Sequence, residues 1–233
     1  MIRVVFLTIT TVLLGGIVAF AQDRSVDMRA VGLLSYASPG GCSATLIGPD
    51  LVLTAAHCLM SPDGSGARAP DTVFFHPSTR TLQVGAAVGG VEVIVHPVYR
   101  MPGLPEERQI GRDLGLVRLS SIVPPELATP LRVTAQPGAI SSGFITSFGG
   151  LNGGPARQRK CSVIRRVAGV FWLGCRVQAG ESGAPFLVRD GDAVTVAGVV
   201  SSRASAGRQP IALIVDLRSG FQGLREAARE ISK

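Results

Sequence analysis

The sequence has few lysines and few aromatic residues, and arginine supplies nearly all of its positive charge. Aromatic residues make up 5% of the 233 residues, and Lys160 and Lys233 are the only lysines among 23 basic residues. The net charge of +7 would suit an anionic partner, and the basic residues are densest at 157–160 and 165–166. Few aromatic side chains lie among them to stack on nucleic-acid bases. We therefore expect a solvated basic face and no nucleic-acid partner.

Long apolar runs are missing after the first 21 residues. Met1–Ala21 has a positive residue at Arg3, an apolar stretch at Val4–Ile17 and the small-x-small pattern Ala19-Phe20-Ala21, which is typical of a cleaved signal peptide. The alternative is an uncleaved membrane anchor, because the apolar stretch is about as long as a membrane span. We predict a signal peptide at residues 1–21. The mature chain, beginning at Gln22, is then secreted or periplasmic, without stable membrane insertion.

Metal-binding cysteine patterns are missing too. The sequence has no Cys-x-x-Cys pair, and its three histidines are scattered, which argues against a zinc site. We expect neither a metal nor another cofactor. The four cysteines are an even number, and in an exported chain that favours disulfide bridges.

Amphipathic helix patterns are missing until the end of the chain. Short apolar runs recur instead between glycine- and proline-rich turns, and this predicts an all-β fold, either a sandwich or a barrel. A carboxy-terminal helix is predicted at Phe221–Ile231. The predicted strands are Ala44–Ile47, Leu51–Leu53, Thr72–Phe75, Val91–Val95, Leu114–Leu119, Phe144–Phe148, Phe186–Val188 and Ala193–Val200.

Three short segments carry residues suited to nucleophilic catalysis. Thr54-Ala55-Ala56-His57-Cys58 ends a predicted hairpin in a histidine, whose pKa near neutrality suits proton transfer. Gly180-Glu181-Ser182-Gly183-Ala184-Pro185 places a serine between glycines, which allow a sharp turn. Arg112-Asp113-Leu114 opens an apolar strand between the two. Each segment alone has an ordinary explanation, since a lone histidine is more often part of a core.

Together the three segments resemble the signatures of the chymotrypsin-like (trypsin-fold) serine proteases, in the order histidine, aspartate, serine. The resemblance extends from about Val31 to the carboxy terminus. It implies two six-stranded antiparallel β-barrels, at residues 22–125 and 126–233, with the active site between them. The linker would lie near Ser120–Leu131, where prolines favour an extended crossing.

The resemblance also implies roles for individual residues. Ser182 would be the nucleophile, His57 its general base and Asp113 the residue that orients the histidine, with the N–H groups of Gly180 and Ser182 as the oxyanion hole. The substrates would be proteins or peptides. The family places a disulfide behind the catalytic histidine, which pairs Cys42 with Cys58 and leaves Cys161 to pair with Cys175. We expect a monomer.

Two departures from the trypsin pattern point to a particular branch. Glu181 stands where zymogen-forming relatives have an aspartate that binds a newly released amino terminus, and no Ile-Val-Gly-Gly-like start precedes Val31. The chain is therefore closer to the bacterial glutamyl-endopeptidase-like proteases, which need no such insertion.

Substrate binding is predicted from the same alignment of motifs. Arg176 lies six residues before Ser182, where trypsin-type enzymes carry their pocket-floor aspartate, and Ser201 and Arg203 lie on the strand that would hold the substrate backbone. Two arginines would favour an acidic side chain before the scissile bond. If Arg176 instead points to solvent, a small or aliphatic side chain is expected. The competing functions are a catalytically silent homologue that binds peptides or a partner protein, and a basic adhesion or nucleic-acid-binding exoprotein.

Overall fold

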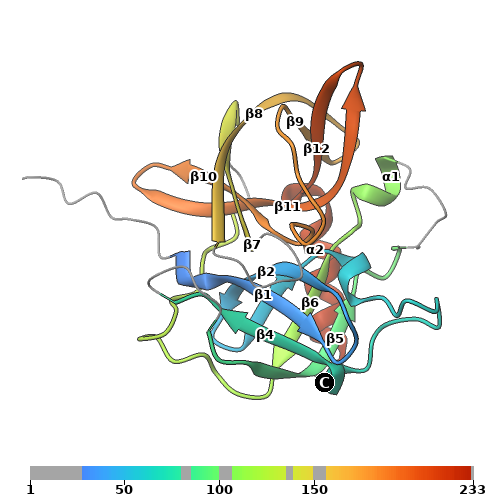
Figure 1. Ribbon diagram of the computed structural model, residues 1–233, viewed down its shortest axis with the longest axis vertical. Helices are drawn as coiled ribbons and strands as arrows, with labels where there is room; N and C mark the ends of the chain where they lie inside the picture. Colours follow the sequence, from blue (N-terminus) through green and yellow to red (C-terminus); the bar gives the residue numbers. More distant parts are fainter. Residues whose placement is uncertain (1–27, 80–84, 100–106, 135–138, 149–155, 232–233) are drawn as a thin grey trace, which may run out of the picture.

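The computed structural model describes residues 28–79, 85–99, 107–134, 139–148 and 156–231 (Figure 1). The predicted signal peptide at 1–21 lies outside the described residues. Within the described part of the chain, no helix is both long and apolar enough to span a membrane.

Two closed antiparallel barrels of six strands each make up the fold, as predicted from the sequence. Barrel 1 has the strand order β1-β2-β3-β6-β5-β4 and is drawn in blue to green in Figure 1. Its strands are β1 (Val31–Tyr36), β2 (Gly41–Gly48), β3 (Leu51–Thr54), β4 (Val73–Pro77), β5 (Val88–Val95) and β6 (Gly115–Leu119). The same part of the sequence contains four short helices, which are η1 (Met28–Ala30), η2 (Ala56–Leu59), η3 (Pro70–Thr72) and α1 (Glu107–Ile110).

Barrel 2 has the order β10-β11-β12-β9-β8-β7 and lies above barrel 1 in Figure 1. Its strands are β7 (Ser142–Phe148), β8 (Ala156–Val167), β9 (Val170–Leu173), β10 (Pro185–Asp190), β11 (Ala193–Ala206) and β12 (Gln209–Asp216). β11 runs six residues beyond the predicted strand end at Val200, because it continues to pair with β12 as far as Ala206 and Gln209. The residues of this extension, 201–206, are serine, alanine and arginine, and they form no apolar pattern that would predict a strand.

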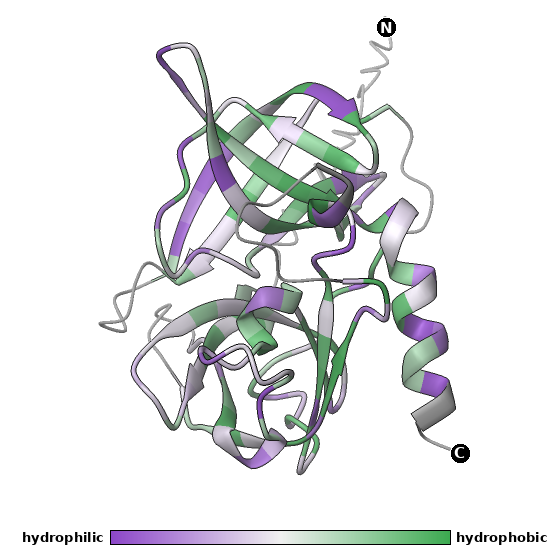
Figure 2. Cartoon of the chain, turned by 90° about the vertical axis from the view of Figure 1, so that its right-hand side faces the viewer, coloured by the Kyte–Doolittle hydropathy of each residue, from purple (hydrophilic) through white to green (hydrophobic). Residues whose placement is uncertain are grey.

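The carboxy-terminal helix α2 (Leu217–Ile231) begins four residues before the predicted start at Phe221. The Asp216 carboxylate accepts a hydrogen bond from the Arg218 N–H, and this satisfies a donor of the first helical turn. The cap outweighs the low helix propensity of Gly220. α2 leaves barrel 2 and runs alongside barrel 1 (Figure 2), where Leu224 is fully buried.

The largest hydrophobic core joins the two barrels. It is centred on barrel 1 side chains such as Leu53 and Phe75, and it also includes Leu187, Val199 and Leu224 from barrel 2 and α2. A second core fills barrel 2, where the rings of Phe171 and Phe186 pack with centroids 5.8 Å apart. Burial of apolar surface therefore stabilises the contact between the barrels as well as each barrel.

Both predicted disulfides are confirmed. Cys42 is bonded to Cys58 and Cys161 to Cys175, so each bridge lies within one barrel. The predicted linker contains a turn rather than a continuous extended crossing, because the Pro124 carbonyl accepts hydrogen bonds from the N–H groups of Leu127 and Ala128. The predicted division between residues 125 and 126 falls in this turn.

Candidate active site

His57 and Asp113 are in direct contact at the inner ends of two adjacent barrel 1 strands. His57 lies in η2, immediately after β3, and Asp113 lies just before β6, which pairs with β3. The Nδ1 atom of His57 is 2.8 Å from Oδ2 of Asp113, and the His57 backbone N–H donates to Oδ1 at 2.9 Å. A carboxylate that accepts at Nδ1 requires the proton on that nitrogen. The neutral ring therefore has its lone pair on Nε2.

The pKa of His57 is raised from its ordinary value by its environment. Burial alone lowers the pKa of this histidine, but the hydrogen bond to Asp113 and the negative charge of Asp113 together more than offset that effect. The His57 side chain keeps 28% of its surface exposed, whereas the Asp113 side chain keeps 4%. Solvent and a bound molecule can thus reach the histidine but not its carboxylate partner.

Ser201, on β11, reaches Asp113 from the second barrel. Its buried hydroxyl donates to Oδ2 of Asp113, the same oxygen that faces the His57 ring. From the sequence, Ser201 is expected only on a substrate-binding strand, and this contact is not predicted. No local pattern reveals it, because 88 residues separate the two partners.

Ser182 lies in a tight turn that packs against both barrel 1 and β11. The Ser182 carbonyl accepts a hydrogen bond from the Ser43 N–H at 2.7 Å, and the Gly183 N–H donates to the Val200 carbonyl at 2.8 Å. Gly183 has a φ of +80°, and a Cβ there would lie 2.1 Å from both the Ser43 oxygen and Thr54 Oγ1. Only glycine allows this approach.

The turn therefore brings Ser182 next to the segment that carries His57 and to the strand that carries Ser201. His57 and Ser182 themselves, both within the described residues, share no hydrogen bond. The His57 Nε2 atom instead lies 3.6 Å from the sulfur of Cys58. Hydrogen bonds between catalytic groups are often long in unliganded proteins and shorten when substrate binds.

The N–H groups of Gly180 and Ser182 have no acceptor within the described residues. Gly180 has a φ of +87°, and its carbonyl accepts a hydrogen bond from the Ser43 hydroxyl at 3.1 Å. The neighbouring N–H groups have fixed partners, since Glu181 donates to Gln178 and Gly183 to Val200. Two free donors, one on the serine itself and one two residues before it, match the requirement of an oxyanion hole.

These features agree with the results of comparison with known proteins. The family model described as Trypsin matches residues 18–217. The chain belongs to the trypsin family. No curated protein is similar enough to count as a match. Among solved structures, a thermostable serine protease, AL20, from an extremophilic microorganism is similar with a TM-score of 0.67. It shares 16% sequence identity, and the similarity covers 87% of this chain and 98% of the other, so it supports the fold.

Glu181, where trypsin-family zymogens carry an aspartate, is fully buried and ion-paired. Its Oε1 atom is 2.5 Å from Nη2 of Arg159 on β8 and accepts from the Ser147 hydroxyl, and its Oε2 atom accepts from the Gln178 N–H. The basic segment at 157–160 is assigned to a solvated face by its sequence. That assignment is wrong for Arg159, because its guanidinium turns inward to Glu181.

The predicted substrate residues Arg176 and Arg203 line one cavity of about 400 Å³ in this trypsin-family chain. Both side chains are exposed, and the cavity follows the segment that leads to Ser182. Two arginines and part of the segment 176–182 thus line the cavity, and Ser182 itself is not among its lining residues. The full lining is Arg176, Val177, Gln178, Arg203, Ala204, Ser205, Pro210 and Ile211.

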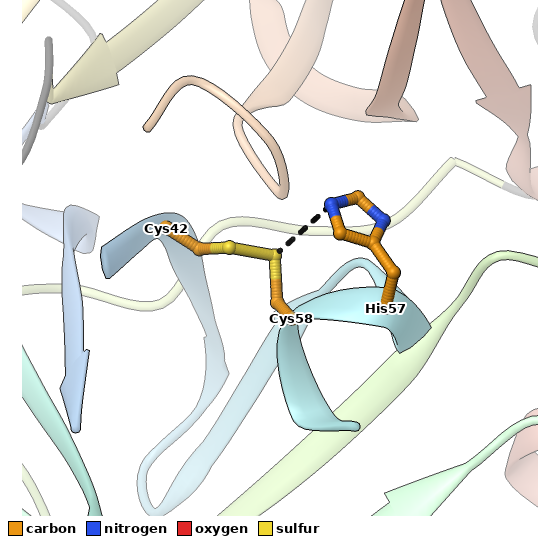
Figure 3. A group of neighbouring side chains, drawn as sticks. All are labelled: Cys42, His57 and Cys58. Carbon is orange, nitrogen blue, oxygen red and sulfur yellow. Dashed lines mark hydrogen bonds between the residues drawn. A yellow bond between two sulfur atoms is a disulfide. The ribbon is translucent and has the colours of Figure 1, made fainter. Parts of the chain in front are cut away.

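Cys42, His57 and Cys58 form the one group within the described residues that has the compactness of a metal site (Figure 3). Metal ligation by cysteine requires a thiolate, and both sulfurs are bonded to each other. The group as it stands is a disulfide that supports the edge of the His57 ring.

Proposed function

We propose that the chain is a serine endopeptidase that hydrolyses proteins or peptides through an acyl-enzyme on Ser182. The contact between His57 Nδ1 and Asp113 Oδ2 at 2.8 Å is the observation that carries this proposal. It leaves Nε2 as the basic nitrogen of a ring whose side chain is 28% exposed. A serine hydroxyl is a weak nucleophile by itself and needs such a base.

In the acylation step, His57 Nε2 accepts the proton of the Ser182 hydroxyl as Oγ forms a bond to the carbonyl carbon of the scissile peptide. The carbonyl π electrons move to oxygen, and the resulting oxyanion accepts hydrogen bonds from the N–H groups of Gly180 and Ser182. Asp113 stabilises the imidazolium. His57 then donates its proton to the leaving amine, and the carbon–nitrogen bond breaks.

Deacylation repeats these steps with water as the nucleophile. His57 accepts a proton from water, the hydroxide oxygen bonds to the acyl carbon, and the same donors stabilise the second oxyanion. The proton returns to Ser182 Oγ as the ester bond breaks, and a carboxylic acid product leaves. The enzyme is restored without a metal or cofactor in any step.

Substrate selection is proposed to depend on the cavity lined by residues 176–178, the start of the segment that leads to Ser182. We propose that Arg176 and Arg203 bind an acidic side chain on the amino-terminal side of the scissile bond, with the β11 strand at Ser201–Arg203 alongside the substrate backbone. Guanidinium groups bind carboxylates through paired hydrogen bonds and repel lysine and arginine. This preference would place the chain in the glutamyl-endopeptidase-like branch.

The proposed setting is outside the cytoplasm, secreted or periplasmic, after removal of residues 1–21. Two disulfides in one chain support it, because disulfides persist mainly in oxidising compartments. We further propose a monomer of two domains, divided near residue 125.

A serine-directed phosphonylating probe tests the proposed activity. We expect the purified wild-type protein to be labelled once, at Ser182, and to lose its peptidase activity in parallel. Ser182→Ala should abolish both labelling and hydrolysis, while circular dichroism stays unchanged. An unlabelled, inactive wild-type protein would instead identify a catalytically silent homologue.

A peptide library varied at the residue before the scissile bond tests the proposed preference. We expect cleavage after Glu or Asp, and Arg176→Ala and Arg203→Ala should each weaken it, mainly through KM. Arg189→Ala, which removes a positive charge from β10 outside this cavity, is the control. Strong cleavage after Lys or Arg would overturn the preference without affecting the proposed activity.

A further inference from the structure

Arg159 contacts both ends of the segment 176–182, which leads from the cavity lined by Arg176 and Arg203 to Ser182. One guanidinium nitrogen, Nη2, lies 2.5 Å from Oε1 of Glu181, and the other, Nη1, donates to the backbone carbonyl of Arg176. Glu181 stands directly between Gly180 and Ser182, the two residues with free N–H groups. A single side chain on β8 therefore links the beginning and the end of the segment 176–182.

The inward direction of Arg159 follows from the strand. Arg159 pairs across the sheet with Ile145, which is fully buried, and Cys161 two residues later is also buried on the same side of β8. Successive side chains of a strand alternate between its faces. The alternation of faces would place an apolar side chain at position 159. The chain has an arginine there instead.

Glu181 needs this partner because its carboxylate is almost completely removed from water. The Glu181 side chain is 1% exposed, whereas that of Arg159 is 25% exposed. A buried charge is tolerated only when it is paired and hydrogen-bonded. Glu181 meets that condition with Arg159, the Ser147 hydroxyl and the Gln178 N–H, which makes three donors to one carboxylate.

We propose that Arg159 is a positioning residue that holds the segment 176–182 so that the N–H groups of Gly180 and Ser182 point toward the substrate. The inference rests on the proposed function of that segment. Arg159 acts through the Glu181 side chain, which fixes the backbone on either side of it, and through the Arg176 carbonyl, which fixes the far end. The positive charge that orders the oxyanion hole is thereby supplied from inside barrel 2.

Kinetics of Arg159→Ala test this role. We expect kcat to fall by about 100-fold, comparable to the loss of an oxyanion-hole donor, with little change in KM for a short peptide. Guanidinium ions at concentrations far below those that unfold proteins should restore part of the lost kcat, since the vacated site reaches solvent. Arg157→Ala is the matched control, because it removes the same side chain from an exposed position on the same strand. It should keep full activity and gain nothing from guanidinium.

Amide hydrogen exchange provides a readout independent of turnover. The N–H groups of Gln178 and Glu181 take part in the hydrogen bonds that Glu181 organises. Their exchange should accelerate in Arg159→Ala and stay unchanged in Arg157→Ala. Unchanged exchange in Arg159→Ala, or full activity, would overturn the inference. If the wild-type protein neither hydrolyses peptides nor reacts with a phosphonylating probe, the proposed function fails, and exchange alone decides whether Arg159 holds the segment.

Arg159→Lys keeps the inference testable should Arg159→Ala fail to fold. Lysine retains a positive charge for Glu181, but one ammonium group cannot reproduce the fork that reaches both Glu181 and the Arg176 carbonyl. We expect this variant to fold, to exchange faster at residues 176–178 and to lose kcat several-fold. Wild-type exchange and kcat in a folded Arg159→Lys protein would overturn the role of the second contact.

Discussion

Asp113 is the residue on which the contacts of the site converge. Its carboxylate accepts hydrogen bonds from the His57 backbone, faces the His57 ring and accepts from the Ser201 hydroxyl. The first two contacts come from barrel 1 and the third from barrel 2. The orientation of the histidine therefore depends on the docking of the two barrels as well as on its own strand.

Asp113→Asn should lower kcat by about 10⁴-fold, because an amide in this place no longer favours the ring tautomer with its lone pair on Nε2.

In the wild-type protein kcat/KM should fall on acidification through an apparent pKa above about 6.5, the ordinary value for histidine, since protonated His57 cannot act as a base. Removal of the Asp113 charge should move this limb to lower pH. A wild-type limb below the ordinary histidine value would contradict the assignment.

The same shift has a consequence for stability. The folded protein binds the His57 proton more tightly than the unfolded chain does, since the pKa is raised on folding. The resulting stabilisation is fully present below the unfolded pKa of about 6.5 and is lost as the pH rises through the folded pKa. Asp113→Asn should abolish this part of the pH dependence of the unfolding free energy.

Ser201→Ala should slow turnover by about 10-fold, in line with the loss of one buried hydrogen bond to a charged group. The hydroxyl acts through Asp113, so we expect a change in kcat and in the acidic limb of the pH profile, with KM preserved. Ser202→Ala, which changes the next residue on the same strand, is the control. An effect confined to KM would assign Ser201 to substrate binding alone.

At the scale of elements, the hairpin of β8 and β9 connects the stability of barrel 2 to the pocket. β8 supplies Arg159 and Cys161, and the segment after β9 carries Cys175 and Arg176. The Cys161–Cys175 disulfide therefore joins β8 to the same segment that Arg159 contacts from β8. The Cys161–Cys175 disulfide and the Arg159–Glu181 ion pair thus both connect β8 to the segment that leads to Ser182.

The double variant Cys161→Ala/Cys175→Ala should lower the free energy of unfolding by about 3 kcal/mol, the value for a loop of this length in the chain-entropy model. Denaturant titration measures the change. Activity per folded molecule should also decline, because the wall that carries Arg176 is less constrained. The oxidised wild-type protein, which keeps both bridges, provides the comparison, and a variant as stable as the wild type would show that the bridge adds nothing to folding.

Prediction from sequence succeeded where the information is local. Short apolar runs between turns identified most strands, and the segments around His57, Asp113 and Ser182 identified the family. The contacts of Arg159 with Glu181 and of Ser201 with Asp113 were not predicted, because each joins residues from different elements. A half-buried arginine looks in the sequence like any other member of a basic run, and only strand pairing shows which way it faces.

At the scale of the whole molecule, the internal ion pair gives Glu181 a cationic partner other than an amino terminus. We predict that the chain beginning at Gln22 is active without further cleavage, even when a tag blocks its first residue. The physical reason is that Glu181 already has its cationic partner in Arg159. Activity assays before and after tag removal provide the measurement. Activity that appears only after trimming would contradict the prediction.

The location of the disulfides has a consequence for how the molecule can be divided. All four cysteines are bonded within their own barrel, so the barrels are held to each other by the shared core, by hydrogen bonds such as that from Ser201 to Asp113, by α2 and by the linker. His57 and Asp113 belong to one half, and Ser182 and Ser201 to the other. Cutting the chain at the turn near Pro125 would yield two separate fragments. Each would contain one internal disulfide and only part of the proposed catalytic residues. Reassociation of the fragments would restore peptidase activity, and the enzyme would then serve as its own reporter of complementation.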